Sequence, residues 1–274
     1  MNIGIIGCGT IGSELAKSIE KFNGVSIVAL CDVDEEKAKK LLLQLSTKPQ
    51  IVGIDKLIEI SELVIESASK HIVKEVAEKT LFKGKDLMIM SVGGLIGNDP
   101  HISAPIYEHI FKLAEKNNCK LYIPSGAICG LDGVNSASIG KINSVTLTTT
   151  KPPKALEGAP YIVKNKINLN TITTKTIIFE GSALEAVDAF PANINVAASL
   201  SIAGIGAEKT KVKIVADPNT GKNMHEIVVE GVFGKLTTST ENLPSPNNPK
   251  TSYLAVLSAI SMVKKIVGNV KVGN

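Results

Sequence analysis

The chain has 274 residues, of which 44% are hydrophobic, so it is long enough to bury one or two sizeable cores. Its net charge of +4 rests on lysine alone, because none of the 30 basic residues is an arginine. The lysines are scattered among acidic residues without aromatic neighbours, which argues against nucleic-acid binding, and no apolar stretch is long enough to cross a membrane.

The first residues lack a basic segment ahead of an apolar one, so we expect no signal peptide and a cytoplasmic protein. The four cysteines have neither a CxxC spacing nor histidine companions, so we expect reduced core thiols and no metal site. They are Cys8, Cys31, Cys119 and Cys129. Without a guanidinium group, anions have to be held by lysine, backbone N–H groups, hydroxyls or helix ends.

The segment from Met1 to Asp32 shows the pattern of a dinucleotide-binding unit. An apolar run meets GCGTIG at residues 7–12, a helical pattern follows, and a second apolar run stops at Asp32. The three glycines allow a tight turn, a close approach of the backbone to a pyrophosphate, and close packing of helix on strand. Asp32 is expected to accept hydrogen bonds from the adenosine ribose. The predicted cofactor-binding residues are Gly7, Gly9, Thr10, Ile11, Gly12 and Asp32.

Strand-like and helical runs then alternate to about Pro124, as parallel βαβ units require. We expect helices over 34–45, 73–81 and 107–117, and strands over 51–52, 63–66, 87–92 and 120–123. These elements predict an α/β fold in which residues 1–124 form a Rossmann-type, doubly wound dinucleotide-binding domain.

After Ser125 the sequence pattern changes. Runs that alternate between apolar and polar residues, or that are rich in β-branched residues, occur at 144–150, 175–180, 211–216 and 225–240. Helical patterns lie between them, at 184–189 and 193–203. The turn at residues 217–221 is expected to join the last two runs as a hairpin. We therefore predict a second, α+β substrate domain on a mixed or antiparallel sheet, spanning residues 125–247.

Near the C-terminus, Asn248 is expected to cap a helix that has Pro249 at its first position. Its apolar face needs a partner, so we expect residues 248–274 to pack on the first domain. Lys250 and Thr251 would lie in the first turn of this helix, where anions are favoured, and are candidate substrate-binding residues.

Small residues follow two strands of the first domain, at Ser91 to Gly94 and at Ser125 to Gly130. Ligands of doubly wound sheets bind outside the carboxyl ends of the strands, where small residues let the backbone approach a flat nicotinamide ring. Ser91 is therefore a candidate cofactor contact, with an ordinary strand-to-helix turn as the alternative.

His225 opens a strand directly after a turn and shares a face with Asn223. A histidine titrates near neutral pH, so it is a candidate for proton transfer, with a surface turn histidine as the alternative. Asn193 and Asn195 begin an apolar helix, and N-capping explains one of them. The second would hold the nicotinamide carboxamide or a substrate carboxylate. Asn195 and Asn223 are therefore candidate substrate-binding residues.

Six segments together resemble the L-aspartate dehydrogenase family: GCGTIG, SVGGL, PSGAICGLDG, FPANINVAASLSIAG, NMHEI and NNPKTSYLAVLSAI. The resemblance implies that His225 is the active-site histidine, and that Ala127 and Asn193 contact the nicotinamide nucleotide. It implies the oxidation of L-aspartate with NAD, or alternatively NADP, to iminoaspartate, which hydrolyses to oxaloacetate and ammonia. It further implies a homodimer and a role in NAD biosynthesis.

Two other functions stay open. A homoserine dehydrogenase or dihydrodipicolinate reductase would have a similar layout, but the sequence lacks the paired lysines of the first and the adjacent histidines of the second. An NAD(H)-sensing regulator would need a DNA- or partner-binding module, and neither a winged-helix segment nor a basic patch is evident. The acidic residues from Asp32 to Glu36 predict NAD over NADP, because a 2′-phosphate would meet carboxylates there.

Overall fold

The computed structural model describes residues 1–102, 104–191, 194–246 and 248–273. Two compact units divide the chain. One comprises Met1–Pro124 with Ala255–Val272 as its main C-terminal part, and the other comprises chiefly Ser125–Ser245. The predicted fold class is confirmed, because a six-stranded parallel sheet occurs in the first unit and a five-stranded mixed sheet in the second.

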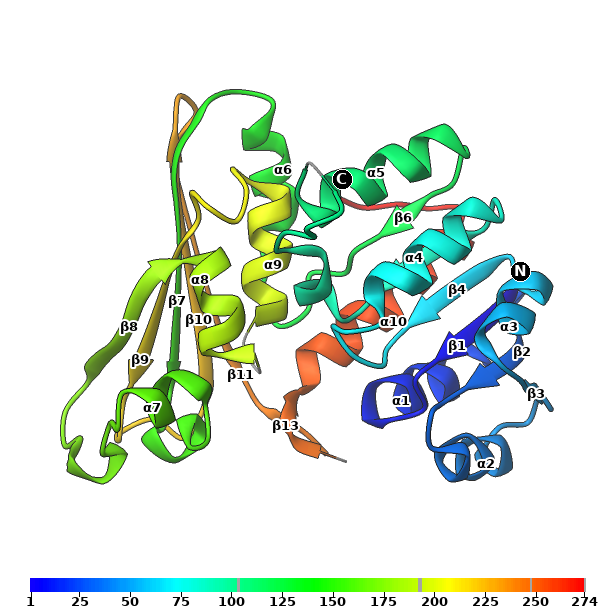
Figure 1. The fold of residues 1–274 in the computed structure, drawn as a ribbon, viewed down its shortest axis with the longest axis horizontal. Helices are drawn as coiled ribbons and strands as arrows, with labels where there is room; N and C mark the ends of the chain where they lie inside the picture. Colours follow the sequence, from blue (N-terminus) through cyan, green and yellow to red (C-terminus); the bar gives the residue numbers. More distant parts are fainter. Residues whose placement is uncertain (103, 192–193, 247, 274) are drawn as a thin grey trace. The chain divides into compact units, whose positions relative to one another are not determined.

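The sheet of the first unit has the strand order β3-β2-β1-β4-β5-β6, and every neighbouring pair is parallel (Figure 1). The order reverses between β1 and β4, and ligands of such sheets bind outside the carboxyl ends of the strands at this reversal. The strands are β1 (Asn2–Ile6), β2 (Ser26–Cys31), β3 (Gln50–Ile51), β4 (Leu63–Glu66), β5 (Asp86–Ile89) and β6 (Leu121–Tyr122).

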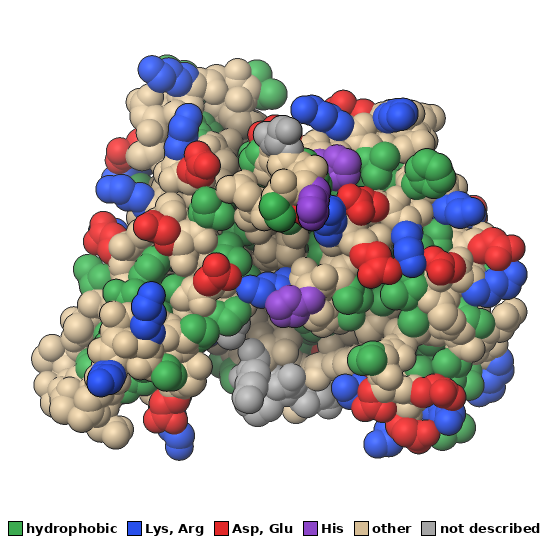
Figure 2. All heavy atoms as spheres, viewed as in Figure 1, with side chains coloured by type: hydrophobic (Ala, Val, Ile, Leu, Met, Phe, Trp, Pro, Cys, Tyr) green, Lys and Arg blue, Asp and Glu red, His purple; other side chains and the backbone are tan. Residues whose placement is uncertain are grey.

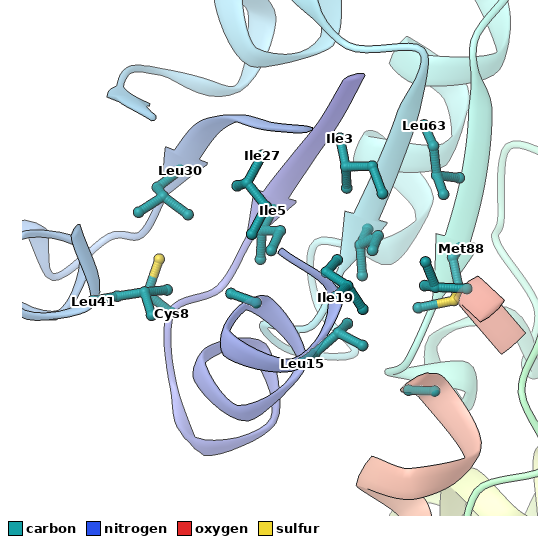
Figure 3. Close-up of a cluster of buried hydrophobic side chains, with 14 of the residues drawn as sticks. Ile3, Ile5, Cys8, Leu15, Ile19, Ile27, Leu30, Leu41, Leu63 and Met88 are labelled. Atoms are coloured by element: carbon teal, nitrogen blue, oxygen red, sulfur yellow. The ribbon is translucent and has the colours of Figure 1, made fainter. Parts of the chain in front are cut away.

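Helices cover both faces of this sheet. Ile3 and Ile5 of β1 share a buried cluster with residues of α1 (Thr10–Ile19), α2 (Glu35–Gln44) and α10 (Tyr253–Val267) (Figure 3). On the opposite face, a Cβ at Gly4 would meet Leu57 of α3 (Ile54–Ile60), which therefore packs directly on the backbone of β1. Further elements of this unit are α4 (Val73–Phe82), η1 (Val92–Leu95) and α5 (Ile106–Lys116).

The second sheet has the order β11-β10-β7-β9-β8, in which β7 pairs antiparallel with β10 and parallel with β9. Helices α6, α8 and α9 lie along one face (Figure 1). A Cβ at Gly204 would meet Val145 of β7, so the chain after α9 packs closely on the middle strand. The strands are β7 (Ile142–Lys151), β8 (Thr176–Ser182), β9 (Lys211–Ala216), β10 (Asn223–Gly231) and β11 (Gly234–Asn242). The other elements are α6 (Leu131–Ser138), η2 (Pro153–Leu156), α7 (Pro160–Lys164), η3 (Leu169–Thr171), α8 (Ala183–Ala189), α9 (Ile194–Ala203) and β12 (Pro244–Ser245).

The predicted hairpin across residues 217–221 is wrong. The strands on either side of this turn, β9 and β10, do not pair with each other, because β7 lies between them. The turn residues are as expected, with Asn219 N donating to the Asp217 carboxylate. A local turn pattern cannot reveal a strand that enters from 70 residues earlier. The run 225–240, in turn, is two strands that form their own hairpin.

The predicted helix start at Asn248 is also wrong. Asn248–Ser252 is strand β13, and helix α10 begins at Tyr253. A residue before proline disfavours the helical conformation, and the β-branched Thr251 favours a strand. Lys250 and Thr251 therefore lie in a strand and not at a helix N-terminus, which removes the reason for expecting an anion site there. Ala259 and Val263 of α10 lie in the buried cluster of the first unit.

Across the described residues, no helix is long and apolar enough to cross a lipid bilayer. Positive and negative side chains are interspersed on the face drawn in Figure 2. Ion pairs along single helices agree with this picture: Lys39 lies 3.1 Å from Glu35, and Lys79 lies 2.9 Å from Glu75. Such exposed pairs add little to stability.

Candidate active site

The glycine turn between β1 and α1 has the geometry that a pyrophosphate site needs. Gly7 has a φ of +91°, which other residues rarely adopt. A Cβ on Gly12 would lie 1.9 Å from the Gly7 carbonyl oxygen, so only glycine fits there. A Cβ on Gly9 would meet nothing within 4 Å, which means that the turn is open on this side. Gly9 is also the N-cap of α1 and has no side chain to occupy the helix N-terminus.

Asp32 follows β2 and organises the two loops beside it. Its carboxylate accepts hydrogen bonds from Cys8 N at 2.7 Å and from Asp34 N at 2.8 Å. A carboxylate has about four lone-pair sites, so acceptor positions are left for the hydroxyls of a ribose. The arrangement fits the dinucleotide predicted from the sequence.

Glu66, at the end of β4, is a buried carboxylate that sequence reasoning missed. It accepts hydrogen bonds from Ala68 N at 2.8 Å, Ser91 N at 3.0 Å and Ser91 Oγ at 2.9 Å. Burial raises the pKa of this carboxyl group, and the hydrogen bonds oppose that rise. The Ser91 hydroxyl is thus engaged with Glu66, and the pair fixes the loops that follow β4 and β5. The sequence pattern of residues 63–66 predicted only a strand.

The loop from Ser125 to Gly130 is attached to β11 by a ladder of side chains. The Ala127 carbonyl accepts hydrogen bonds from Asn242 Nδ2 at 2.9 Å and Thr240 Oγ1 at 3.0 Å. Thr238 Oγ1 donates to the Cys129 carbonyl at 3.2 Å. These residues alternate along β11, so they share one face of the strand and hold the loop in register.

His225 is the third residue of β10 and lies on the buried face of the second sheet, with 3% of its surface exposed. The alternative of a surface turn histidine is therefore wrong. Its Nδ1 lies 2.9 Å from the hydroxyl of Thr149, which is buried opposite it on β7. When Nδ1 carries the proton, Nε2 is left as an acceptor, and no described residue occupies it. Burial, helped by the charge of Lys151, lowers the pKa of His225 to about 3, well below the near-neutral value expected from the sequence.

Lys151 ends β7, two residues beyond Thr149, and was not singled out from the sequence. Burial lowers the pKa of its ammonium group to about 8. The signal was present in the alternation of Val145, Leu147 and Thr149, because continuing it by one step places Lys151 on the same buried face.

The other residues predicted from the sequence to bind cofactor or substrate lie in different parts of the fold. Asn223 precedes His225 on the same face of β10, and its Oδ1 is buried without a partner among the described residues. Asn195 is exposed in the first turn of α9, and Asn193 lies outside the described residues. Ser91, the glycine turn and Asp32 belong to the first unit, whereas Ala127, Asn195, Asn223 and His225 belong to the second.

The four cysteines differ in how deeply they are buried. All four are free, and no group of three or more His, Cys, Asp or Glu side chains among the described residues could hold a metal ion. Cys8 is buried, and burial together with Asp32 raises the pKa of its thiol to about 12. The expectation of core thiols is wrong for Cys129, which is exposed at the surface loop after β6.

Comparison with known families gives two matches that together cover most of the chain. Residues 7–124 match the family described as homoserine dehydrogenase, NAD binding domain. Residues 132–266 match the family described as aspartate dehydrogenase, C-terminal. The second match covers the sheet that carries Thr149, Lys151 and His225.

Curated relatives match over nearly their whole length. An L-aspartate dehydrogenase of Methanosarcina acetivorans is 51% identical over 275 residues, covering 100% of this chain and 99% of the relative. One from Nitrosopumilus maritimus is 44% identical, covering 96% and 95%. A solved aspartate dehydrogenase of Thermotoga maritima has a TM-score of 0.75 at 27% identity and covers 100% of this chain and 99% of its own. A Lactobacillus casei scyllo-inositol dehydrogenase with bound NAD(H) has a TM-score of 0.56 at 17% identity, which shows a shared fold only.

Proposed function

This chain belongs to the L-aspartate dehydrogenase family, and from that membership we propose that it catalyses the NAD-dependent oxidation of L-aspartate. The product, iminoaspartate, hydrolyses to oxaloacetate and ammonia. The observation that carries the proposal is the 51% identity to a curated L-aspartate dehydrogenase over the full chain. The protein is therefore an oxidoreductase that acts on the CH–NH₂ group of an amino acid, and NAD is its cofactor.

The first unit has the groups that NAD requires. The open side of the turn at Gly9 and the N-terminus of α1 suit the pyrophosphate, and Asp32 suits the adenosine ribose. Thr10, Ile11 and Ser91 are the other contacts that we propose from this unit, with Ser91 placed by Glu66. When bound, NAD supplies the hydride acceptor.

In the second unit, His225 is the residue that we propose to be catalytic. Its imidazole is neutral at physiological pH, because burial lowers its pKa to about 3. In the tautomer whose Nδ1–H donates to the Thr149 hydroxyl, Nε2 accepts a hydrogen bond or a proton. The negative charges of a bound dicarboxylate would raise the pKa of His225 and make it a stronger base in the complex. Ala127 and Asn193 are proposed nicotinamide-nucleotide contacts, and Asn195 and Asn223 are proposed substrate contacts.

Several finer statements are proposals of the same kind. We assign dinucleotide binding to residues 1–124 with the C-terminal helix, and substrate binding and catalysis to residues 125–247. We expect a cytoplasmic homodimer that supplies iminoaspartate to NAD biosynthesis.

The test is to incubate the purified protein with NAD and a panel of substrates while following NADH absorbance. The panel is L-aspartate, D-aspartate, L-glutamate, L-homoserine and L-malate. We expect turnover of L-aspartate alone, with oxaloacetate and ammonia formed in equal amounts. Oxidation of L-homoserine would instead support the sister-enzyme alternative. NAD binding without turnover of any substrate would support the sensor alternative.

A further inference from the structure

Lys151 lies in a corner of the second sheet where four polar side chains share one face. It follows Thr149 by two residues on β7, so the two side chains point to the same side. Strand β10 pairs antiparallel with β7, with His225 opposite Thr149 and Met224 opposite Thr150. Extending this register by one residue places Asn223 opposite Lys151. Thr149, Lys151, Asn223 and His225 thus form two adjacent cross-strand rows at the end of the sheet.

No described residue forms an ion pair or a hydrogen bond with the Lys151 ammonium group, although the side chain is half-buried and burial lowers its pKa to about 8. The charged groups at this end of the flanking strands have other partners. The Asp217 carboxylate, after β9, accepts a hydrogen bond from Asn219 N at 2.9 Å. Glu241, on β11, is paired with Lys222. His225 is uncharged and carries no compensating negative charge.

A cation that is partly withdrawn from water normally has an anion beside it, because the loss of hydration disfavours an unpaired charge. Asn223 offers a second unmet group in the same corner, since its Oδ1 is a buried acceptor without a partner among the described residues. The Lys151 ammonium group lacks an anion, and the Asn223 carbonyl oxygen lacks a hydrogen-bond donor. An amino acid supplies both, because it has a carboxylate and an ammonium group. The chain has no arginine that could serve instead.

We propose that Lys151 holds a carboxylate of the substrate, beside His225, and thereby selects a dicarboxylic amino acid. This inference rests on the proposed function, because that function supplies a substrate with two carboxylates. The ion pair forms only when the substrate binds. Above pH 8, where much of Lys151 is uncharged before binding, substrate binding therefore brings a proton with it.

The first test compares Lys151→Met with Lys151→Arg in the full chain. Methionine removes the charge and fills a similar volume, so we expect KM for L-aspartate to rise by roughly 30-fold or more while NAD affinity is unchanged. Arginine keeps the charge and should stay within about tenfold of the wild-type KM. Lys213→Met is the matched control, because Lys213 lies on the same sheet and pairs with Glu180, and it should leave KM unchanged. A normal KM in Lys151→Met, with NAD affinity intact, would overturn the proposal.

The second test does not depend on turnover. Succinate, a dicarboxylate that cannot be deaminated, is titrated into the NAD-loaded protein by calorimetry at pH 9, in two buffers of different ionisation enthalpy. We expect the wild type to take up close to one proton per succinate bound, because the pKa of free Lys151 is about 8. Lys151→Arg should bind succinate without proton uptake, and Lys151→Met should bind it weakly. Equal proton uptake in all three proteins would contradict the proposal.

These tests separate the inference from the proposed function. Should the wild type fail to oxidise L-aspartate but bind succinate with proton uptake that Lys151→Met loses, the carboxylate site stands and the proposed substrate falls. A different pair of results would show that Lys151 is a proton acceptor and that the proposal is wrong. In that case Lys151→Arg keeps the wild-type KM and succinate affinity but loses kcat, and added methylamine restores kcat to Lys151→Ala.

Discussion

The hydroxyl of Thr149 lies 2.9 Å from Nδ1 of His225, and both side chains are almost fully buried on adjacent strands. The bond fixes the ring and engages Nδ1, so Nε2 is the nitrogen left to meet a ligand. It also means that the environment of His225 is built by β7, more than 70 residues earlier in the chain.

Replacing His225 with alanine should lower kcat for L-aspartate by roughly 10²–10⁴-fold, because a general acid–base group contributes about that much. Steady-state kinetics and NAD titration are the measurements, and NAD affinity should stay near wild type. His225→Asn is the matched variant, since an amide hydrogen-bonds a carboxylate but cannot take a proton. Near-normal kcat in either variant rules out proton transfer by His225, and a raised KM alone indicates a binding role.

Thr149→Val should weaken catalysis through His225 while leaving the imidazole in place. The loss of one neutral hydrogen bond corresponds to about 1 kcal/mol, so we expect kcat to fall by roughly five- to tenfold. Thr149→Ser keeps the hydroxyl and should retain most of the activity. Equal kcat in the valine and serine variants would show that the bond to Nδ1 is not needed.

Acidification should destabilise the protein through His225. Its folded pKa of about 3 lies below the usual 6.5, so the unfolded chain binds the proton first as the pH falls. The contribution is complete above pH 6.5 and is lost between pH 6.5 and 3, by about 1.4 kcal/mol per pH unit. Urea unfolding of wild type and His225→Asn at pH 7, 6 and 5 measures how the free energy of unfolding depends on pH. As the pH falls, the wild type should lose stability faster than the variant. The same pH dependence in both proteins would refute the lowered pKa of His225.

The elements that the sequence predicted well are those with local causes. Strands β4 and β9 have the predicted bounds, 63–66 and 211–216, because the first run ends at Glu66 and the second ends just before Asp217. The glycine turn was also predictable, since a positive φ at Gly7 and the contact at Gly12 require glycine. The insertion of β7 between β9 and β10 was not, because strand pairing over a long separation leaves no local pattern.

Two site residues escaped prediction for a related reason. Glu66 and Lys151 each end a strand, where a charged residue normally meets solvent. Only the folded chain shows that Glu66 is enclosed with Ser91, and that the half-buried Lys151 lies near enough to His225 for its charge to lower the pKa of the imidazole. Charge in the sequence predicts exposure, so a buried charged group at a site is the feature that sequence reasoning finds last.

Asp32 should make the enzyme prefer NAD, because the 2′-phosphate of NADP would be repelled by its carboxylate. We expect a higher kcat/KM with NAD, and Asp32→Asn should narrow the difference. Asparagine is the better variant than alanine, because its amide oxygen can still accept a hydrogen bond from Cys8 N or Asp34 N. Comparable kcat/KM values for NAD and NADP in the wild type would count against a role of Asp32 in cofactor selection.

The glycine turn offers a matched pair of substitutions that separates cofactor binding from folding. Gly12→Ala places a methyl group 1.9 Å from the Gly7 carbonyl oxygen, so helix α1 must move away from the turn. Overpacking of this kind typically costs about 1–3 kcal/mol, and here it falls on backbone that cannot yield easily. We expect a lower free energy of unfolding together with weaker NAD binding.

Gly9→Ala adds the same methyl group where nothing lies within 4 Å, and Gly9 has a φ of −70°, which alanine adopts without strain. We therefore expect the stability of this variant to stay within about 0.5 kcal/mol of wild type. Its methyl group would nevertheless stand where a pyrophosphate approaches the backbone, so NAD affinity should fall by roughly tenfold or more. Calorimetric NAD titration and urea unfolding of both variants decide the matter. Unchanged NAD affinity in Gly9→Ala would mean that the pyrophosphate does not bind against this turn.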